Sequence, residues 1–342
     1  MTKRKTEPSI PTVTIEGDVC SHPRVPLGLW SLDRALGFRD QVGMVLRAVY
    51  ELYGNPGSGK STLARYMAGR VKSTGTVIVC DLEVAEDRDY LRTILESSGL
   101  SGKGRMINYM KKEKGEEKAR THEEMVQEAV DALLDPEVNA VVIDSIGMFM
   151  PVAEREGDFG EAFMGKRAKE VAQIVRKSLA WMAEAKEPKA LIAVNHVLET
   201  LATPVKGHYT PGGVELKYAA TARIMMWRKE TMAHGAFQAE LRVEKLRQGG
   251  AGKERSASVF FIPGVGVSRG MTALFDCFRA KLATREASVK LRGTKVARIG
   301  ELLDAGMDGK EDVFQPFHEA LARFGSQADE EEETDAETET DE

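Results

Sequence analysis

A glycine-rich segment with the spacing of a phosphate-binding loop lies between an apolar run and an amphipathic run. It consists of Gly54, Asn55, Pro56, Gly57, Ser58, Gly59, Lys60, Ser61 and Thr62, which fit the pattern GxxxxGK[ST]. Glycines let consecutive backbone N–H groups curl around a phosphate, and the N-terminus of the following helix adds positive potential. We expect Lys60 to reach the β and γ phosphates and the Ser61 hydroxyl to ligate Mg²⁺. The segment therefore predicts a nucleoside triphosphate site.

Two carboxylates follow other apolar runs. Asp144 ends the run Ala140–Ile143, and Glu83 lies just beyond the run Val77–Cys80. Ligands collect at the carboxyl ends of parallel strands, so we expect Asp144 to ligate Mg²⁺ and Glu83 to orient the attacking water. Many buried strands end in aspartate, and a glutamate in this place can also be a solvated loop residue. The preceding phosphate loop favours the catalytic interpretation.

Short apolar runs alternate with helical patterns along most of the chain. This alternation predicts an α/β fold with a mostly parallel central sheet flanked by helices. A short amphipathic helix is expected within residues 27–37. The expected strands are 45–52, 76–80, 140–143, 191–194, 222–227, 239–244 and 258–261, and the expected longer helices are 61–71, 88–97, 116–134 and 167–185.

Composition changes divide the chain into four expected parts. Residues 1–25 are an arm that could serve oligomerisation, and residues 26–270 form the ATPase core. Residues 271–328 are expected to form a small C-terminal domain, helical from 271, at 296–303 and at 313–324, with a basic stretch at 281–298. Residues 329–342 carry ten carboxylates and no base, which is typical of a disordered acidic tail. Such a tail either folds back over a basic surface or only aids solubility.

The composition is that of an ordinary globular protein, with 42% hydrophobic and 30% charged residues. The net charge is −5, but without the acidic tail 43 acidic residues face 48 basic ones. The three cysteines are widely spaced, so we expect neither a disulfide framework nor a thiolate metal cluster. We find no apolar run long enough to span a bilayer and no secretory signal, so we expect a cytoplasmic protein without membrane contact.

Together these residues resemble the RecA recombinase family, and in places its phage branch, UvsX. The resemblance runs from about Pro26 to Arg269. Leu27–Gly37 resembles the family's TGxxxLDxALG motif, Asp81-Leu82-Glu83 its D-x-E motif, and Val243–Arg247 its VxKxK motif. The short N-terminal arm departs from the family's polymerisation helix, and residues 271–328 match only loosely.

The resemblance implies further roles at the nucleotide. Asp87 and Tyr90 fall where family members contact and stack on adenine, and Glu83 matches the catalytic glutamate. His196 ends a strand where a polar side chain senses the γ-phosphate. Lys245 and Arg247 correspond to cations that reach the ATP of a neighbouring subunit and act like arginine fingers. Each of these residues could instead be structural.

Two segments resemble the family's DNA-binding loops. The first follows Asp144 and closes near Phe163-Met164-Gly165, and the second spans Glu199–Leu216. Basic side chains and glycine backbone in such loops can track phosphates while bases are splayed. The candidate DNA-binding residues are Arg155, Lys166, Arg167, Lys169, Lys206, His208, Tyr209, Gly212 and Gly213.

The resemblance implies a DNA-dependent ATPase that uses ATP and Mg²⁺. It implies a filament on single-stranded DNA that promotes homologous pairing and strand exchange with duplex DNA in recombination and repair. Mediator and single-strand-binding proteins would be further partners, in the cytoplasm of a cell or of a phage host. The alternatives are a RecA-fold mediator or regulatory ATPase without strand exchange, a hexameric helicase motor, and a DNA-coating protein without enzymatic activity.

Overall fold

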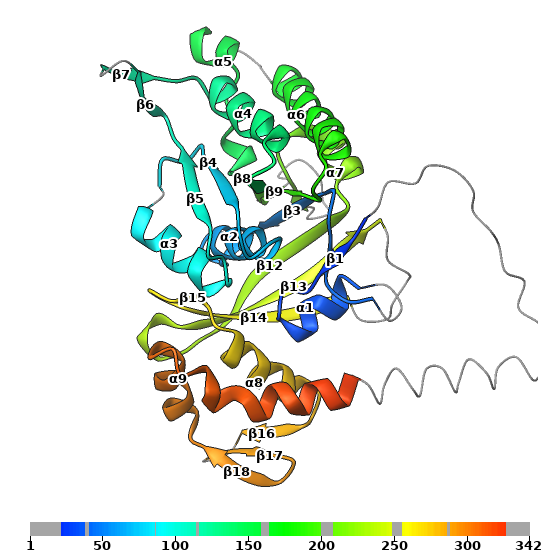
Figure 1. Ribbon diagram of the computed structural model, residues 1–342, viewed down its shortest axis with the longest axis vertical. Helices are drawn as coiled ribbons and strands as arrows, with labels where there is room; N and C mark the ends of the chain where they lie inside the picture. Colours follow the sequence, from blue (N-terminus) through cyan, green and yellow to red (C-terminus); the bar gives the residue numbers. More distant parts are fainter. Residues whose placement is uncertain are drawn as a thin grey trace, which may run out of the picture.

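The centre of the protein is a nine-stranded sheet with strand order β15-β14-β13-β12-β3-β9-β8-β4-β5 (Figure 1). The computed structural model describes residues 22–37, 41–85, 87–113, 116–158, 164–199, 208–247, 255–285 and 288–325. The strands of the sheet are β3 (Ala48–Gly54), β4 (Thr76–Asp81), β5 (Lys103–Ile107), β8 (Val138–Asp144), β9 (Ala190–His196), β12 (Ala222–Thr231), β13 (Phe237–Leu246), β14 (Ser256–Ile262) and β15 (Gly266–Val267).

Six neighbouring strands, from β12 to β5, run parallel. Every residue of β3 and β8 is buried, as expected for strands covered on both faces. β13, β14 and β15 extend the sheet in antiparallel pairs. The predicted α/β fold with a mostly parallel central sheet is therefore confirmed.

Helices cover both faces of the central sheet (Figure 1). On one face, α1 (Trp30–Ala35), α2 (Lys60–Arg70) and α3 (Arg88–Ser97) contribute Leu32, Leu63 and Ile94 to the larger apolar cluster. On the other face, α4 (His122–Asp131) and α6 (Met164–Glu184) contribute Val126 and Val175 to a second cluster. This layering fixes the sheet edge from which the functional loops emerge.

The helix expected at residues 116–134 is shorter in the structure. Glu116–Ala119 form β7, which pairs with β6 (Met110–Glu113) in a hairpin, and α4 follows. Thr121 and Glu124 form a reciprocal capping box, so the helix can begin only after Thr121. Its final residues, Ala132–Leu134, form the 3₁₀ turn η1.

The region after the sheet combines helices with a small sheet that the sequence did not predict. Helix α8 (Arg269–Arg279) begins there, close to the expected 271. The basic stretch forms three antiparallel strands, and a tight turn with positive φ at Arg292 and Gly293 joins two of them. The helix expected at 296–303 is therefore wrong at its start, since a strand continues to Ala297. The elements are β16 (Ala283–Arg285), β17 (Val289–Leu291), β18 (Thr294–Ala297), α9 (Ile299–Met307), η4 (Glu311–Phe314) and a helix over 315–325.

Short elements connect these parts. They are β1 (Arg24–Val25), β2 (Met44–Val45), β10 (Leu198–Glu199), β11 (His208–Tyr209), α5 (Val152–Glu156), α7 (Gly213–Ala219), η2 (Ile146–Met148) and η3 (Ala233–Gly235). Among the described residues, no helix is long and apolar enough to cross a membrane. The expected arm (1–25) up to residue 21 and the expected tail (329–342) lie outside the described residues.

Asp276 ties α8 to the sheet and to α1. Its carboxylate accepts hydrogen bonds from the Ser31 backbone N–H at 3.1 Å and from the Ser258 hydroxyl at 3.2 Å, and it is fully buried. Burial raises the pKa of Asp276 from 3.8 to about 6, although the bonds from Ser31 and Ser258 oppose this shift. The folded protein thus keeps a proton that the unfolded chain releases at lower pH.

Replacing Asp276 should therefore change how stability depends on pH. Between pH 4 and 7 the buried Asp276 carboxyl must ionise, which destabilises the folded state. This group therefore makes stability fall as pH rises through that window. The unfolding free energy of Asp276→Asn minus that of the unmodified protein should therefore rise by about 3 kcal/mol from pH 4 to pH 7. Denaturant unfolding at several pH values measures it, with the exposed Asp312→Asn as control. A pH-independent difference would contradict the assignment.

Candidate nucleotide site and DNA interface

The phosphate loop joins the end of β3 to the start of α2, as the motif requires. Gly59, the residue before α2, has a φ of 86°, and a Cβ there would lie 2.7 Å from the ring of Phe261. A side chain is therefore excluded both by the backbone and by the close approach of the ring. Lys60 is buried and donates to the Asn55 carbonyl at 2.8 Å, which holds its ammonium across the loop. Burial lowers the pKa of Lys60, while Asp144 and Glu83 act in the opposite direction.

Asp144 lies at the carboxyl end of β8, beside the phosphate loop. Its carboxylate interacts with the Ser61 hydroxyl and forms a 2.9 Å ion pair with Arg65. Its second oxygen, Oδ1, is buried and has no hydrogen-bond partner in the described protein. A hydroxyl and a carboxylate oxygen are ligands that Mg²⁺ prefers. The two predicted metal residues, Ser61 and Asp144, are thus brought together, and they fit a magnesium ion.

Glu83, His196 and Ser145 form a chain of contacts between β4, β9 and β8. His196 Nε2 lies 3.0 Å from Glu83 Oε1 and 2.8 Å from Ser145 Oγ. The parallel neighbours β4, β8 and β9 end at the same sheet edge, so the three residues meet despite their separation in sequence. The structure therefore brings the predicted water-orienting and γ-phosphate-sensing residues into direct contact.

The two predicted adenine-contacting residues lie at the start of α3. Asp87 caps this helix by accepting from the Tyr90 backbone N–H at 2.8 Å. The Tyr90 hydroxyl lies 3.1 Å from Thr62 Oγ1, which connects α3 to α2 just behind the phosphate loop. Both residues adjoin the site, and each already has a structural partner.

A buried polar network, missed by sequence reasoning, lies beneath this edge. Glu51 is fully buried in β3 and pairs with Arg223 of β12 at 2.5 Å and with the Asn195 amide at 2.9 Å. Asn195 also donates to the Pro211 carbonyl at 2.9 Å, at the end of the second loop. A buried charge is costly unless it is paired, and Arg223 and Asn195 supply the partners of Glu51. The signal in the sequence was a single glutamate inside an otherwise apolar strand.

The candidate DNA residues of the first loop lie on α5 and at the start of α6. Arg167 pairs with Glu154 at 2.5 Å and is half-buried, whereas Arg155, Lys166 and Lys169 are exposed. Arg167 is thus partly used within the protein. Residues 159–163, between these helices, lie outside the described residues.

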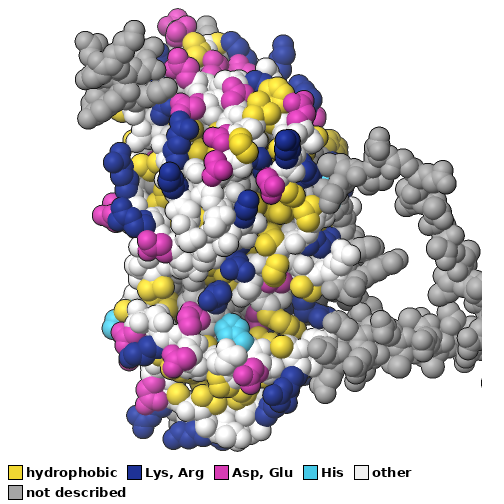
Figure 2. All heavy atoms as spheres, in the orientation of Figure 1, with side chains coloured by type: hydrophobic (Ala, Val, Ile, Leu, Met, Phe, Trp, Pro, Cys, Tyr) yellow, Lys and Arg dark blue, Asp and Glu magenta, His cyan; other side chains and the backbone are white. Residues whose placement is uncertain are grey.

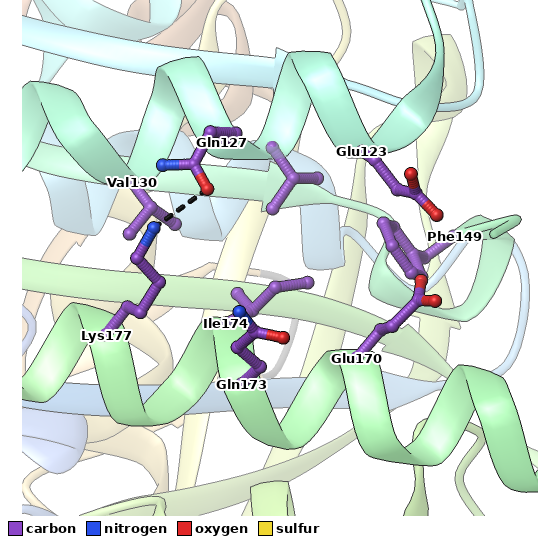
Figure 3. A pocket seen from close by; sticks show the side chains of 9 residues that line it. Glu123, Gln127, Val130, Phe149, Glu170, Gln173, Ile174 and Lys177 are labelled. Atoms are coloured by element: carbon purple, nitrogen blue, oxygen red, sulfur yellow. Dashed lines mark hydrogen bonds between the residues drawn. The ribbon is translucent and has the colours of Figure 1, made fainter. Parts of the chain in front are cut away.

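A groove of about 280 Å³ lies between α4 and α6, and Phe149, which precedes the first loop's helix α5, also lines it (Figure 3). Glu123 of α4 and Glu170 of α6 face each other across it, and Glu123 accepts from the Val152 backbone N–H at 2.8 Å. Burial raises the pKa of Glu170, and the neighbouring Glu123 adds to the shift. Glu123 of α4 therefore contacts the start of α5 and faces α6, the two helices on either side of the first loop.

The second loop has closely held ends. Leu198 and Tyr209 are paired across β10 and β11, and Tyr209 is 43% exposed. Gly212 and Gly213 both have positive φ at the start of α7, a conformation that glycine adopts freely. Lys206 lies outside the described residues, as does the side chain of His208. On the face shown in Figure 2, Lys and Arg are interspersed with Asp and Glu.

Lys245 and Arg247 lie far from this chain's own phosphate loop. Both donate to the Tyr218 carbonyl at the end of α7, at 2.6 Å. The Arg247 backbone is bonded to Thr221, whose N–H in turn donates to Val49 near the start of β3. From that level to the end of β3 is about 16 Å along the strand. The structure therefore does not bring these two cations to the phosphate site of the same chain.

The parallel sheet, the glycine loop and the carboxylates at one edge define a P-loop nucleotide-binding protein. A model of the RecA N-terminal domain matches residues 16–267, most of the chain, and this protein belongs to the RecA family. Similar proteins include RecA of Petrotoga mobilis, 29% identical over 286 residues, which cover 81% of this chain and 70% of the relative. RecA of Bifidobacterium breve is 26% identical over 288 residues (83% and 67%), and RecA of Saccharopolyspora erythraea is 28% identical over 249 residues (72% and 67%).

The contacts of Glu83 lead to a direct test of its role. Glu83→Gln keeps the size and can still bond to His196, but it cannot accept a proton from water. We expect ATP turnover to fall by about a hundredfold or more, while binding of a fluorescent ATP analogue stays within about threefold. Phosphate release and equilibrium binding measure the two quantities. Glu137→Gln, an exposed carboxylate before β8, serves as control, and a loss of turnover below tenfold would refute the assignment.

Proposed function

We propose that this protein is an ATP-dependent recombinase that forms helical filaments on single-stranded DNA and promotes homologous pairing and strand exchange. One observation carries the proposal. The phosphate loop, Glu83 and both candidate DNA loops follow the carboxyl ends of the parallel strands, whereas Lys245 and Arg247 lie toward the amino ends of those strands. A chain with this layout has a complete ATP site only when a second copy supplies the two cations.

The hydrolytic step is assigned to residues of two subunits. Lys60 and the loop N–H groups bind the phosphates, and Glu83 orients the water for attack on the γ-phosphorus. Magnesium, held by Ser61 and Asp144, neutralises phosphate charge when it is bound. Lys245 and Arg247 of the neighbouring subunit stabilise the charge that develops in the transition state.

Nucleotide binding is coupled to DNA through the ends of β9 and the second loop. His196 contacts Glu83, and the adjacent Asn195 bonds the Pro211 carbonyl. A γ-phosphate that engages His196 therefore acts one residue away from the anchor of the second loop. DNA is then held by its backbone through the residues of both loops, and homology is tested by base pairing itself.

Finer assignments rest on the sequence. The Asn195-His196 pair supports a place near the phage UvsX branch, which would put the protein in a host cytoplasm. Residues 1–25 serve subunit assembly, residues 26–270 form the ATPase core, residues 271–328 form a small C-terminal domain, and the acidic residues 329–342 weaken DNA binding by charge. Mediator and single-strand-binding proteins are the expected accessory partners.

DNA-stimulated hydrolysis tests the proposed function. Single-stranded DNA should raise ATP turnover severalfold, and the stimulation should decline at high salt because the contacts are mainly to phosphates. Lys60→Ala should abolish both turnover and ATP-dependent DNA binding. If DNA has no effect at any salt concentration, a mediator or regulatory ATPase is the better description. If Lys60→Ala binds DNA normally, the protein is a coating protein.

Subunit mixing tests whether Lys245 and Arg247 act on the neighbour. The Glu83→Gln chain has intact cations but no base, and the Lys245→Ala/Arg247→Ala chain has the reverse. Each alone should be nearly inactive, whereas an equal mixture should regain about a quarter of the unmodified turnover, since that fraction of seams is complete. Turnover of the mixture on single-stranded DNA measures it. A mixture as inactive as its components would contradict the proposal, because the two cations would then not act on the ATP of the neighbouring subunit.

A further inference from the structure

Arg65 is a buried cation that the reaction described so far does not use. It lies on α2, four residues after Ser61, so both side chains point from the same helix face. Arg65 Nη2 lies 2.9 Å from Asp144 Oδ2, and the two side chains are only 7% and 6% exposed. One turn of α2 thus presents a hydroxyl and a guanidinium to the same carboxylate.

The ion pair sets how Asp144 can sit in its buried position. A buried carboxylate needs a compensating charge, and the Arg65 guanidinium supplies one at 2.9 Å. Lys60 is another cation that interacts with this carboxylate. Without Arg65, Asp144 would compete with the nucleotide phosphates for the Lys60 ammonium. Arg65 therefore leaves Lys60 available to the phosphates.

The two oxygens of Asp144 are not equivalent. Oδ2 is held by Arg65, whereas Oδ1 is buried without a hydrogen-bond partner among the described residues. A buried carboxylate oxygen is costly to leave unpaired, so we expect Oδ1 to bind a ligand in the working site. Oδ1 belongs to the residue that, with Ser61, fits magnesium. The arrangement divides the carboxylate between an internal cation and an external one.

We propose that Arg65 is a positioning residue for the metal: it holds Oδ2 of Asp144 so that Oδ1 faces the magnesium of the bound nucleotide. The inference deepens the proposed ATPase function and rests on it. Partners of metal ligands commonly act this way, because they fix the orientation of the ligand before the metal arrives. In this role Arg65 acts through Asp144 and not on the nucleotide itself.

Metal dependence of nucleotide binding tests this role in the full-length protein. Arg65→Met keeps the length of the side chain and removes its charge and hydrogen bonds. We expect the Mg²⁺ concentration that half-saturates binding of a fluorescent ATP analogue to rise about tenfold. The affinity for Mn²⁺ in the presence of the nucleotide, measured by electron paramagnetic resonance, should fall in parallel. Arg65→Lys, which keeps the charge but loses the planar fork, should give a smaller rise.

A control variant separates positioning from the loss of any buried ion pair. Arg120 pairs with Glu128 at 2.7 Å, away from the phosphate loop residues, and Arg120→Met should leave the Mg²⁺ requirement unchanged. An unchanged or lower Mg²⁺ requirement in Arg65→Met would overturn the proposal, because Arg65 would then only support the fold or repel the metal. If Arg65→Met fails to fold, the Mg²⁺ titration of Arg65→Lys decides in the same way. Failure of DNA to stimulate turnover would instead count against the recombinase function and leave this result intact.

Discussion

Neighbouring parallel strands end at one edge of the sheet, and the chemistry proposed for this protein depends on that constraint. β3 ends at Gly54 and the phosphate loop, β8 ends at Asp144, β9 ends at His196, and β4 leads to Glu83. These strands are adjacent in the sheet, so side chains more than a hundred residues apart meet within hydrogen-bonding distance. Both candidate DNA loops leave from the same edge. We therefore expect any movement of a strand end to act on the nucleotide and on DNA together.

Two arginine–carboxylate pairs lie beneath this edge, and the carboxylate of each is buried. Burying a carboxylate is costly unless a partner and further hydrogen bonds compensate, so each arginine offsets the burial of its partner. Arg65 holds Asp144 beneath the phosphates, and Arg223 holds Glu51 beneath the second loop. The ring of Tyr53 also packs against the Arg223 guanidinium, 4.6 Å from its centre. The two pairs thus lie beneath the two places that the proposed function couples, the nucleotide site and the second loop.

Local patterns in the sequence were sufficient for the parts of the fold whose cause is local. The strand expected at 76–80 is β4 (Thr76–Asp81), and the helix expected at 88–97 has those bounds, because apolar periodicity and the Asp87 cap both lie within the segment. The β6–β7 hairpin and the three strands β16–β18 were missed, because their pairing partners decide their structure. The same holds for Arg65 and Glu51, since a charge becomes informative only when burial and its partner are known. The roles assigned to the site residues stay predictions.

We propose that ATP binds at the interface between two copies of this chain and that ATP binding controls the binding of DNA. Electron microscopy of the purified protein with single-stranded DNA tests it most directly, with and without ATP and Mg²⁺. We expect continuous helical filaments along the DNA that require the nucleotide. Closed rings, or particles that remain single and leave the DNA bare at saturating ATP, would contradict it.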